Sequence, residues 1–177
     1  MEKFLCKIDS KVIDDLNNQI SNNRVLNWAP DYNNQAGISF ENLSYILDYW
    51  KNKFSWTKEE KKLNKFNQFL FEYDNVKTHF LHIKSNQKNS IPLLLIHGWP
   101  GSIFEFNDLI PLLTSPDKNS LQDCQAFDLI IPSLPNVGFS FSPQQKPIDL
   151  TEISSHLIML MKTLGYKKYF IQGGDLG

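Results

Sequence analysis

The sequence predicts an α/β fold in which a mainly helical part, residues 1–85, precedes alternating strands and helices, residues 86–177. Three observations lead to this prediction. Apolar residues recur at helical spacing through much of the first part. From Pro92 onward, continuous apolar runs typical of buried parallel strands alternate with segments of helical period. Glycine or proline follows within two residues of three of these runs, as is common where a strand ends in a turn.

Three helices are expected in the first part. Asp9 or Ser10 is expected to cap the first, and Ser39 to cap the second. The pattern Thr57-Lys58-Glu59-Glu60 resembles a capping box and predicts the start of the third helix, which would run through Leu63 and Phe66. The apolar positions of the first helix share a spacing of four and are Phe4, Ile8, Val12, Leu16 and Ile20. A loop is expected between residues 28 and 37.

Near Val76 the apolar pattern changes to that of strands, the first of which is expected to have one wetter face. The expected strands share β-branched and aromatic residues and cover residues 76–83, 93–96, 127–131 and 169–172. Helices are expected over residues 104–113 and 153–164, the second ending at Gly165, and a polar loop over residues 115–125. Right-handed crossovers between the last three strands would make them parallel.

Composition excludes several classes of function. Eighteen basic and nineteen acidic residues give a net charge of −1, which argues against a general nucleic-acid binder. Only two cysteines occur, Cys6 and Cys124, so neither a disulfide framework nor a metal site is expected, and no cofactor is implied. The sequence shows no signal-peptide-like start and no transmembrane segment. We therefore expect a cytoplasmic protein.

Two loops lie where ligands of an open α/β sheet bind, at the carboxyl ends of strands. His97-Gly98-Trp99-Pro100-Gly101-Ser102 follows the first buried strand, and its backbone N–H groups suit one arm of an oxyanion hole. A plain strand-to-helix turn explains its glycines and proline equally well. The second loop, from Ser133 to Ser140, indicates no more than a loop when taken alone.

The third loop, Gly173-Gly174-Asp175-Leu176-Gly177, follows the last strand. It has the G-x-nucleophile-x-G spacing of a nucleophile elbow, in which small residues relieve crowding at a sharp turn. An aspartate there would attack an electrophilic carbon and form an ester. An ordinary turn is the simpler interpretation of this motif alone, because Asp and Gly are common turn residues.

The order of the three loops is more specific than any one of them. Together with the stretches YILDYW (45–50), HFLHIKS (79–85) and LMKTLGYKKYFIQGGDLG (160–177), it resembles the N-terminal part of an epoxide hydrolase of the microsomal and juvenile-hormone type. The resemblance covers nearly the whole chain. It implies an N-terminal helical extension followed by the first part of an α/β-hydrolase sheet, truncated after the nucleophile strand.

The resemblance also assigns roles to residues. Asp175 would be the nucleophile that opens an epoxide, and the backbone N–H groups of Trp99 and Leu176 would form the oxyanion hole. The Trp99–Pro100 bond would be cis. His97, Gly98 and Pro100 would lie at the substrate, with His97 structural rather than the base. The implied overall activity is hydrolysis of epoxides to vicinal diols, in epoxide metabolism or detoxification.

Two departures from the family pattern affect what is expected. Leu176 stands where the family usually has Trp, which puts the shape of the substrate in doubt. The family's lid tyrosines, acidic residue and water-activating His all follow the nucleophile. We therefore expect the 177-residue chain to lack turnover alone, and its sheet to have an open edge and uncovered apolar faces. His79, His82 and His156 are interpreted as surface or core-edge histidines.

Other functions stay open at this point. A haloalkane-dehalogenase-like enzyme would share the Asp nucleophile, although the helical extension resembles the epoxide group. A non-catalytic remnant or binding module would use that extension as a partner surface. One half of a split hydrolase would need a complementing C-terminal half that carries the missing residues.

Overall fold

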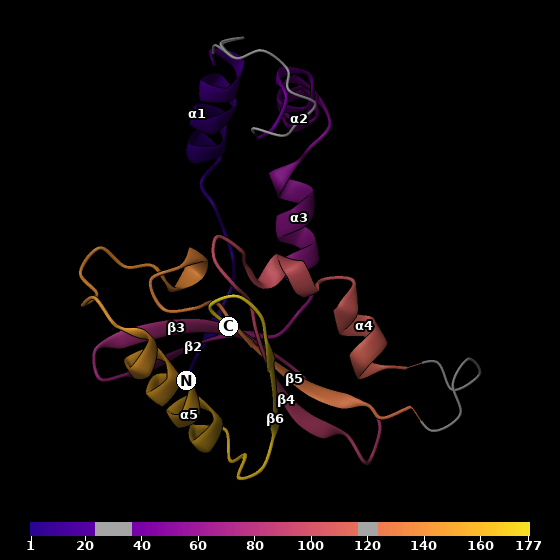
Figure 1. The fold of residues 1–177 in the computed structure, drawn as a ribbon, viewed down its shortest axis with the longest axis vertical. Coiled ribbons are helices and arrows are strands. Elements are labelled where there is room, and N and C mark those ends of the chain that lie inside the picture. Colours follow the sequence, from indigo (N-terminus) through magenta and orange to yellow (C-terminus); the bar gives the residue numbers. More distant parts are fainter. Residues whose placement is uncertain (24–36, 117–123) are drawn as a thin grey trace. The chain divides into compact units, whose positions relative to one another are not determined.

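The computed structural model of the protein describes residues 1–23, 37–116 and 124–177, so most of the two expected loops lies outside the described residues. Among these residues, six strands form one mixed sheet in the order β1-β2-β3-β5-β4-β6 (Figure 1). The chain divides into two compact units, one made of Met1–Leu5 with Phe66–Gly177 and the other of Cys6–Lys65. The boundary at residue 85, drawn from composition, stays a prediction.

The smaller unit contains the three expected helices, α1 (Ser10–Ser21), α2 (Phe40–Asn52) and α3 (Trp56–Leu63). The side chains of Asp9 and Ser39 cap the first two, accepting from the backbone N–H groups of Lys11 and Asn42. This confirms both predicted caps, because an oxygen there satisfies an amide that has no partner within the helix.

The third helix begins earlier than expected. Ser55 is its N-cap residue, although its side chain makes no cap bond to the described residues, and Thr57 lies inside the helix, so the capping box predicted at Thr57 is wrong. Glu60 instead holds the unit together: its Oε2 accepts from Trp56 Nε1 at 3.1 Å and from the Ile8 amide at 2.9 Å. Neither donor is a backbone N–H of the first turn of α3, so Glu60 links the helix to its surroundings rather than capping it.

Two strands of the larger unit were not predicted. Residues Glu2–Phe4 form β1, so Phe4 does not belong to the first helix, and Gln68–Tyr73 form β2. Both pair antiparallel, β1 with β2 and β2 with β3 (Val76–Ile83). Asp74 and Asn75, both in the left-handed region at φ 51° and 59°, make the tight turn between β2 and β3. Residues 78–81 are all buried, so the wetter face expected for β3 is absent there.

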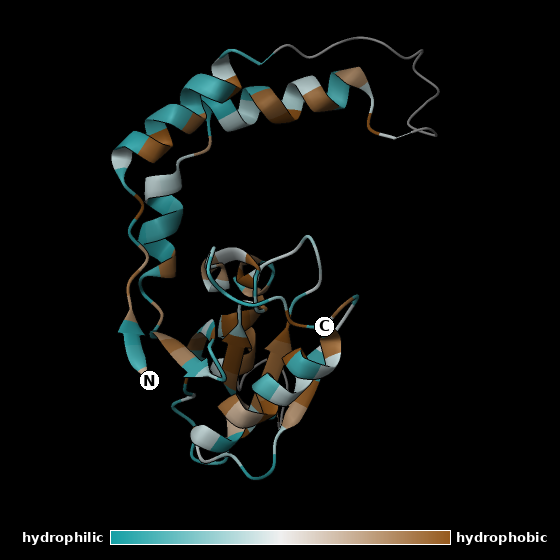
Figure 2. Ribbon diagram, turned by 90° about the vertical axis from the view of Figure 1, so that its left-hand side faces the viewer, coloured by the Kyte–Doolittle hydropathy of each residue, from teal (hydrophilic) through white to brown (hydrophobic). Residues whose placement is uncertain are grey.

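The parallel part of the sheet consists of β4 (Ile91–Ile96), β5 (Phe127–Pro132) and β6 (Phe170–Gly173), with β4 in the middle. Residues 93–96 are buried, as predicted for a strand covered on both faces. In Figure 2 the central strands are the most hydrophobic part of this unit. Its core cluster is made of residues from β2 to β5, the following loop and the helix α5 (Leu150–Thr163), namely Phe71, Phe80, Leu94, Ile96, Ile130, Leu134, Leu157, Leu160 and Met161.

The helices between these strands follow prediction in part. Residues 104–113 are not one helix but a 3₁₀ turn, Ile103–Phe106, followed by α4 (Leu109–Thr114). Pro111 lies in the first turn of α4, where its missing N–H breaks no helical bond. In a helix that began at residue 104 the same proline would lie in the interior and break one, so the helix begins only at Leu109. The helix α5 (Leu150–Thr163) ends as predicted, with Gly165 at φ 87°.

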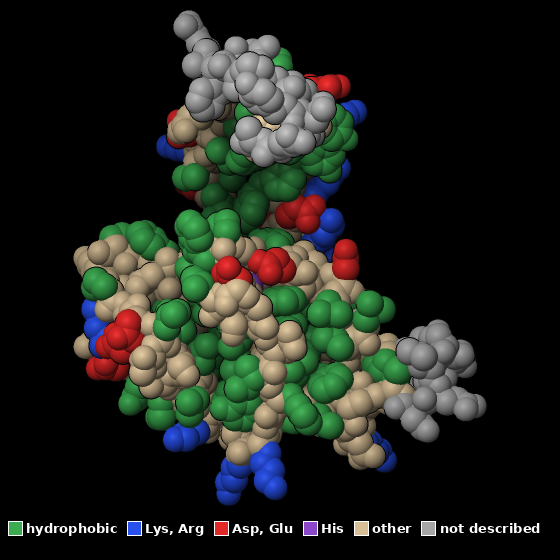
Figure 3. All heavy atoms as spheres, in the orientation of Figure 1, with side chains coloured by type: hydrophobic (Ala, Val, Ile, Leu, Met, Phe, Trp, Pro, Cys, Tyr) green, Lys and Arg blue, Asp and Glu red, His purple; other side chains and the backbone are tan. Residues whose placement is uncertain are grey.

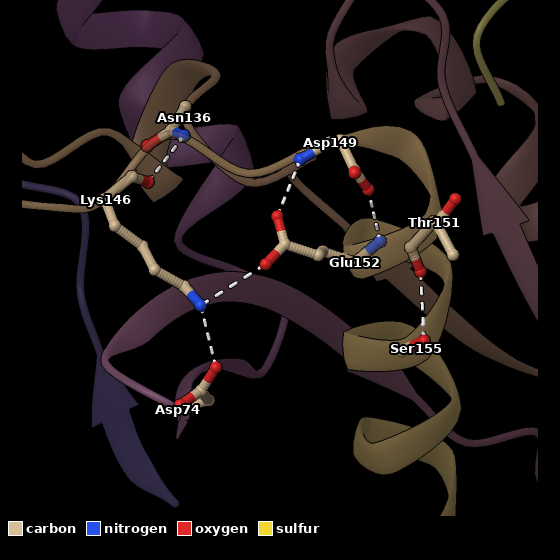
Figure 4. A network of polar contacts seen from close by, with 7 residues as sticks. All are labelled: Asp74, Asn136, Lys146, Asp149, Thr151, Glu152 and Ser155. Carbon is tan, nitrogen blue, oxygen red and sulfur yellow. Dashed lines mark hydrogen bonds and ion pairs between the residues drawn. The ribbon is translucent and has the colours of Figure 1, made fainter.

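A polar network attaches the segment before α5 to the β2–β3 turn (Figure 4). Lys146 Nζ lies 2.8 Å from Asp74 Oδ2 and 3.4 Å from Glu152 Oε1. Glu152 and Asp149 also form a capping box, in which each side chain accepts from the other's backbone N–H. These groups are exposed, so each ion pair contributes little stability and their common effect is to place the segment.

One edge of the sheet is formed by β6, where Phe170 and Ile171 are 61% and 58% exposed. An open edge and uncovered apolar side chains were both expected, and the sheet has both. None of the described helices is long and apolar enough to cross a membrane.

Candidate active site

The turn after β6 is crowded at the positions that the elbow spacing reserves for small residues. A side chain at Gly177 would place its Cβ 2.6 Å from the Ile96 carbonyl oxygen, and one at Gly173 would meet the Gly177 backbone. By contrast, a Cβ at Gly174 meets nothing within 4 Å. Asp175, between Gly173 and Gly177, has φ 57°, a left-handed conformation that is rare for residues with a side chain. The steric reason given for the motif is therefore confirmed.

The loop after β4 is closed by its own side chains. The Trp99–Pro100 bond is cis, as the resemblance implied. Ser102 and Glu105 form a capping box at the 3₁₀ turn, with Glu105 Oε1 accepting from the Ser102 amide at 3.0 Å. The Glu105 carboxylate lies directly against Gly101, so a Cβ at that position would have to displace it. The capping box and this contact thus hold the loop in one compact conformation at the carboxyl end of β4.

The two loops meet at Asp175. The Trp99 N–H donates to Asp175 Oδ1 at 2.8 Å, across 76 residues of sequence. This bond, followed by one from the Leu176 N–H, lowers the pKa of the Asp175 carboxyl below its usual value. The carboxylate is therefore ionised at neutral pH, and the two amides expected to form an oxyanion hole converge on it.

A cleft of about 360 Å³ opens beside this carboxylate. Gly98, Trp99 and Pro100 line it together with Asp175 and the end of β6, while His97 does not. In Figure 3 acidic and hydrophobic side chains adjoin on the face shown. The assignment of His97, Gly98 and Pro100 to substrate binding stays a prediction. Among the described residues, no group of His, Cys, Asp and Glu could hold a metal ion.

His97 lies buried beneath the loop. Its Nδ1–H donates to the Gly98 carbonyl oxygen at 2.7 Å, and its Nε2 accepts from the Leu134 N–H at 3.0 Å. A carbonyl only accepts and an amide N–H only donates, so these partners define one neutral tautomer. The lone pair of the ring is already used, which argues against His97 as the base that activates water.

The interpretation of the other histidines needs correction. His79 and His156 are 0% and 3% exposed, so both lie in the core rather than at the surface or its edge. The ring of His79 bonds Ser133 Oγ and Gln68 Oε1, both at 3.0 Å. Sequence reasoning missed this residue, because a histidine in a strand carries no signal of partners that lie far along the chain. His82 is half-buried, with Nε2 2.9 Å from the Tyr166 hydroxyl.

Gly98 gives a test of this geometry. A Cβ there would lie 2.7 Å from Asp175 Cβ and 2.9 Å from Oδ1. We expect Gly98→Ala to displace the carboxylate from the Trp99 amide. If Asp175 is the nucleophile that the resemblance implies, its attack on an epoxide should slow by about 10²-fold, since misplacement of about 1 Å has such an effect. The rate is measured by intact mass. Gly174→Ala is the control, and equal slowing by both variants would contradict the steric explanation.

Comparison with known proteins gives matches along the whole chain. The model of "Epoxide hydrolase N terminus" matches residues 1–106, and that of "alpha/beta hydrolase fold" matches residues 91–177. "Epoxide hydrolase 1" of Sus scrofa is 34% identical over 178 residues, which covers 98% of this chain and 39% of the pig protein.

Solved structures agree with the sequence matches. The epoxide hydrolase of Aspergillus niger superposes with a TM-score of 0.84 at 31% identity, over 99% of this chain and 46% of that one. The juvenile hormone epoxide hydrolase of the silkworm Bombyx mori gives 0.83 at 31% identity, over 99% and 42%. The chain thus spans less than half the length of each of these relatives.

Proposed function

Because this chain belongs to the epoxide hydrolase family, we propose that its cleft carries out the nucleophilic step of epoxide hydrolysis and that Asp175 is the nucleophile. The supporting observation is the bond of 2.8 Å between the Trp99 N–H and Asp175 Oδ1. It brings an ionised carboxylate and an amide donor together at the mouth of a cleft. Hydrolysis to a vicinal diol would then take place in two steps.

In the first step a carboxylate oxygen of Asp175 attacks one ring carbon of the epoxide. The bond from that carbon to the ring oxygen breaks, its electron pair goes to the oxygen, and the alkoxide takes up a proton. The product is an ester between Asp175 and the opened substrate. The low pKa of Asp175 suits this step, because only the ionised carboxylate attacks.

In the second step water adds to the ester carbonyl, which becomes a tetrahedral oxyanion. The N–H groups of Trp99 and Leu176 would stabilise that charge, since they already converge on the carboxylate. Collapse of the oxyanion expels the diol and restores Asp175. This step needs a base to take a proton from water, and His97, with both ring nitrogens bonded, does not supply one.

We therefore propose that the 177-residue chain alone forms the ester, with solvent water protonating the alkoxide, but does not turn over. A base for the attacking water, and a dedicated proton donor for the alkoxide, would come from a complementing C-terminal segment, whether in one longer chain or in a second one. The small-molecule partner is an epoxide, and the exposed side chain of Leu176 lies next to the nucleophile. No step of this chemistry calls for a cofactor.

Incubation with styrene oxide tests both parts of the proposal. The expected result is a mass increase of one epoxide equivalent, located by peptide mapping on the segment that contains Asp175, without sustained diol release. Modification of other carboxylates at the same rate would contradict the nucleophile assignment. Steady diol production would contradict the proposed lack of turnover.

A further inference from the structure

A chain of hydrogen bonds runs from the core of the sheet to the nucleophile, and the mechanism above uses only its last member. It begins at His79 in the middle of β3 and passes through the loop Ser133–Ser140, called the β5 loop below. It then crosses His97 to the loop after β4. All of its members lie in the larger unit.

His79 holds both ends of the β5 loop. Its backbone carbonyl accepts from the Ser133 amide at 2.9 Å, and its ring Nδ1 lies 3.0 Å from Ser133 Oγ. Its backbone N–H donates to Ser140 Oγ at 2.9 Å, and that hydroxyl donates to the Ser133 carbonyl at 2.7 Å. The two ends of the loop are therefore tied to each other and to one residue of the neighbouring strand.

The roles of these groups are mutually consistent. Gln68 Oε1 can only accept, so His79 Nε2 carries the proton and Nδ1 accepts from the Ser133 hydroxyl. Burial lowers the pKa of His79 to about 4, which keeps the ring in this neutral form at neutral pH. Among the described residues, no buried side-chain N or O atom lacks a partner. A network satisfied in this way is rigid, because any rotation leaves a buried group unpaired.

The bonds to the β5 loop also determine where the Leu134 amide lies, because Leu134 follows Ser133 directly. This amide donates to His97 Nε2 at 3.0 Å. His97 then donates from Nδ1 to the Gly98 carbonyl at 2.7 Å. That carbonyl and the Trp99 N–H belong to one planar peptide unit and point in opposite directions. Holding the carbonyl on one side therefore aims the N–H at Asp175 on the other.

We propose that His79 is a positioning residue, which acts through the β5 loop and His97 to orient the Gly98–Trp99 peptide toward the nucleophile. The significance of this role for catalysis rests on the proposed function of Asp175. The hydrogen-bond chain itself does not, because it is a property of the folded protein. An oxyanion-hole donor must point at the position of the oxyanion before the charge develops. A satisfied network in the core holds the Trp99 N–H in that orientation, so the donor need not reorganise during the reaction.

Three variants separate positioning from folding. Ser133→Ala removes the link between the loop and the His79 ring while leaving the backbone bonds, and His79→Gln removes the ring. His82→Gln is the matched control, since His82 lies on the same strand and its ring bonds Tyr166 rather than the loop. Each variant is compared by the amide spectrum of the whole chain, which reports folding, and by the Trp99 amide proton, which reports the bond to Asp175.

The expected result is an upfield shift of the Trp99 amide proton in Ser133→Ala and in His79→Gln, with little change in His82→Gln. Reaction with styrene oxide should slow by about tenfold in the first two, less than the 10²–10³-fold effect of deleting a donor. If His79→Gln does not fold, Ser133→Ala decides. An unchanged Trp99 amide in a folded Ser133→Ala would overturn the proposal. If the amide shifts as expected but the wild-type chain forms no adduct, the positioning role stands and the proposed function fails.

Discussion

Replacing Asp175 by asparagine is expected to abolish ester formation with styrene oxide, lowering its rate by about 10⁴-fold or more. The amide keeps an oxygen for the Trp99 N–H and nearly the same shape, so the 2.8 Å hydrogen bond can persist. It lacks the negative charge and nucleophilicity of the carboxylate, and no other group of the elbow can replace them. Intact mass after incubation with the epoxide measures the effect.

Asp128→Asn is the matched control for this variant. Asp128 Oδ1 also accepts from a backbone amide, that of Ser85 at 2.9 Å, but it lies at the amino end of β5, opposite the edge that carries the elbow. This variant should react like the wild-type chain. Equal loss of reactivity in both would mean that the substitutions act through stability rather than through the nucleophile.

Acidification is expected to destabilise the larger unit, with His79 as the main histidine responsible. Burial lowers its pKa from 6.5 to about 4 in the folded chain. Above pH 6.5 the ring is neutral in both states, and the full stability is present. As the pH falls from 6.5 towards 4, the unfolded chain binds a proton that the folded chain resists. The free energy of unfolding should therefore decrease, by about 3 kcal/mol for a shift of this size.

Urea unfolding between pH 4 and pH 7 measures this decrease, and the difference from a His79→Gln variant separates it from the titration of carboxylates. The variant should show a flatter dependence on pH over this range. Burial also lowers the pKa of His82 and His156, which add in the same direction in both proteins. A folded-state NMR titration midpoint for His79 near 6.5 would contradict the prediction.

The parts of the fold that sequence reasoning predicted correctly are those with a strong local signal. The run Leu93–Ile96 is apolar throughout, as a strand between two covered faces must be. The stripe of α5 ends at a glycine with positive φ, and the elbow glycines stand where backbone atoms of neighbouring residues leave no room. In each case the signal itself is a run or a spacing of residue types within a few positions, even where, as at Gly177, the atoms that crowd the residue come from a distant strand.

The strands that were missed depend on distant partners. β1 has three residues, and its partners in β2 are more than sixty positions away. β2 follows a helix closely, and its apolar residues fit either period over so short a stretch. Pairing with β3 through a tight turn is what makes it a strand. The same holds for Glu60, whose bond to the Ile8 amide joins residues 52 positions apart.

The sequence by itself determined the resemblance to the N-terminal part of an epoxide hydrolase, because a helical extension, two loops at the carboxyl ends of strands and an aspartate between glycines follow one another in that order. Only the tertiary structure decided that His79 and His97 are core residues bonded to the β5 loop, and that the Trp99 amide faces Asp175. The physical reason is that motifs are constraints on neighbouring residues, whereas hydrogen-bond partners 37, 54 and 76 positions apart meet only when the sheet has formed.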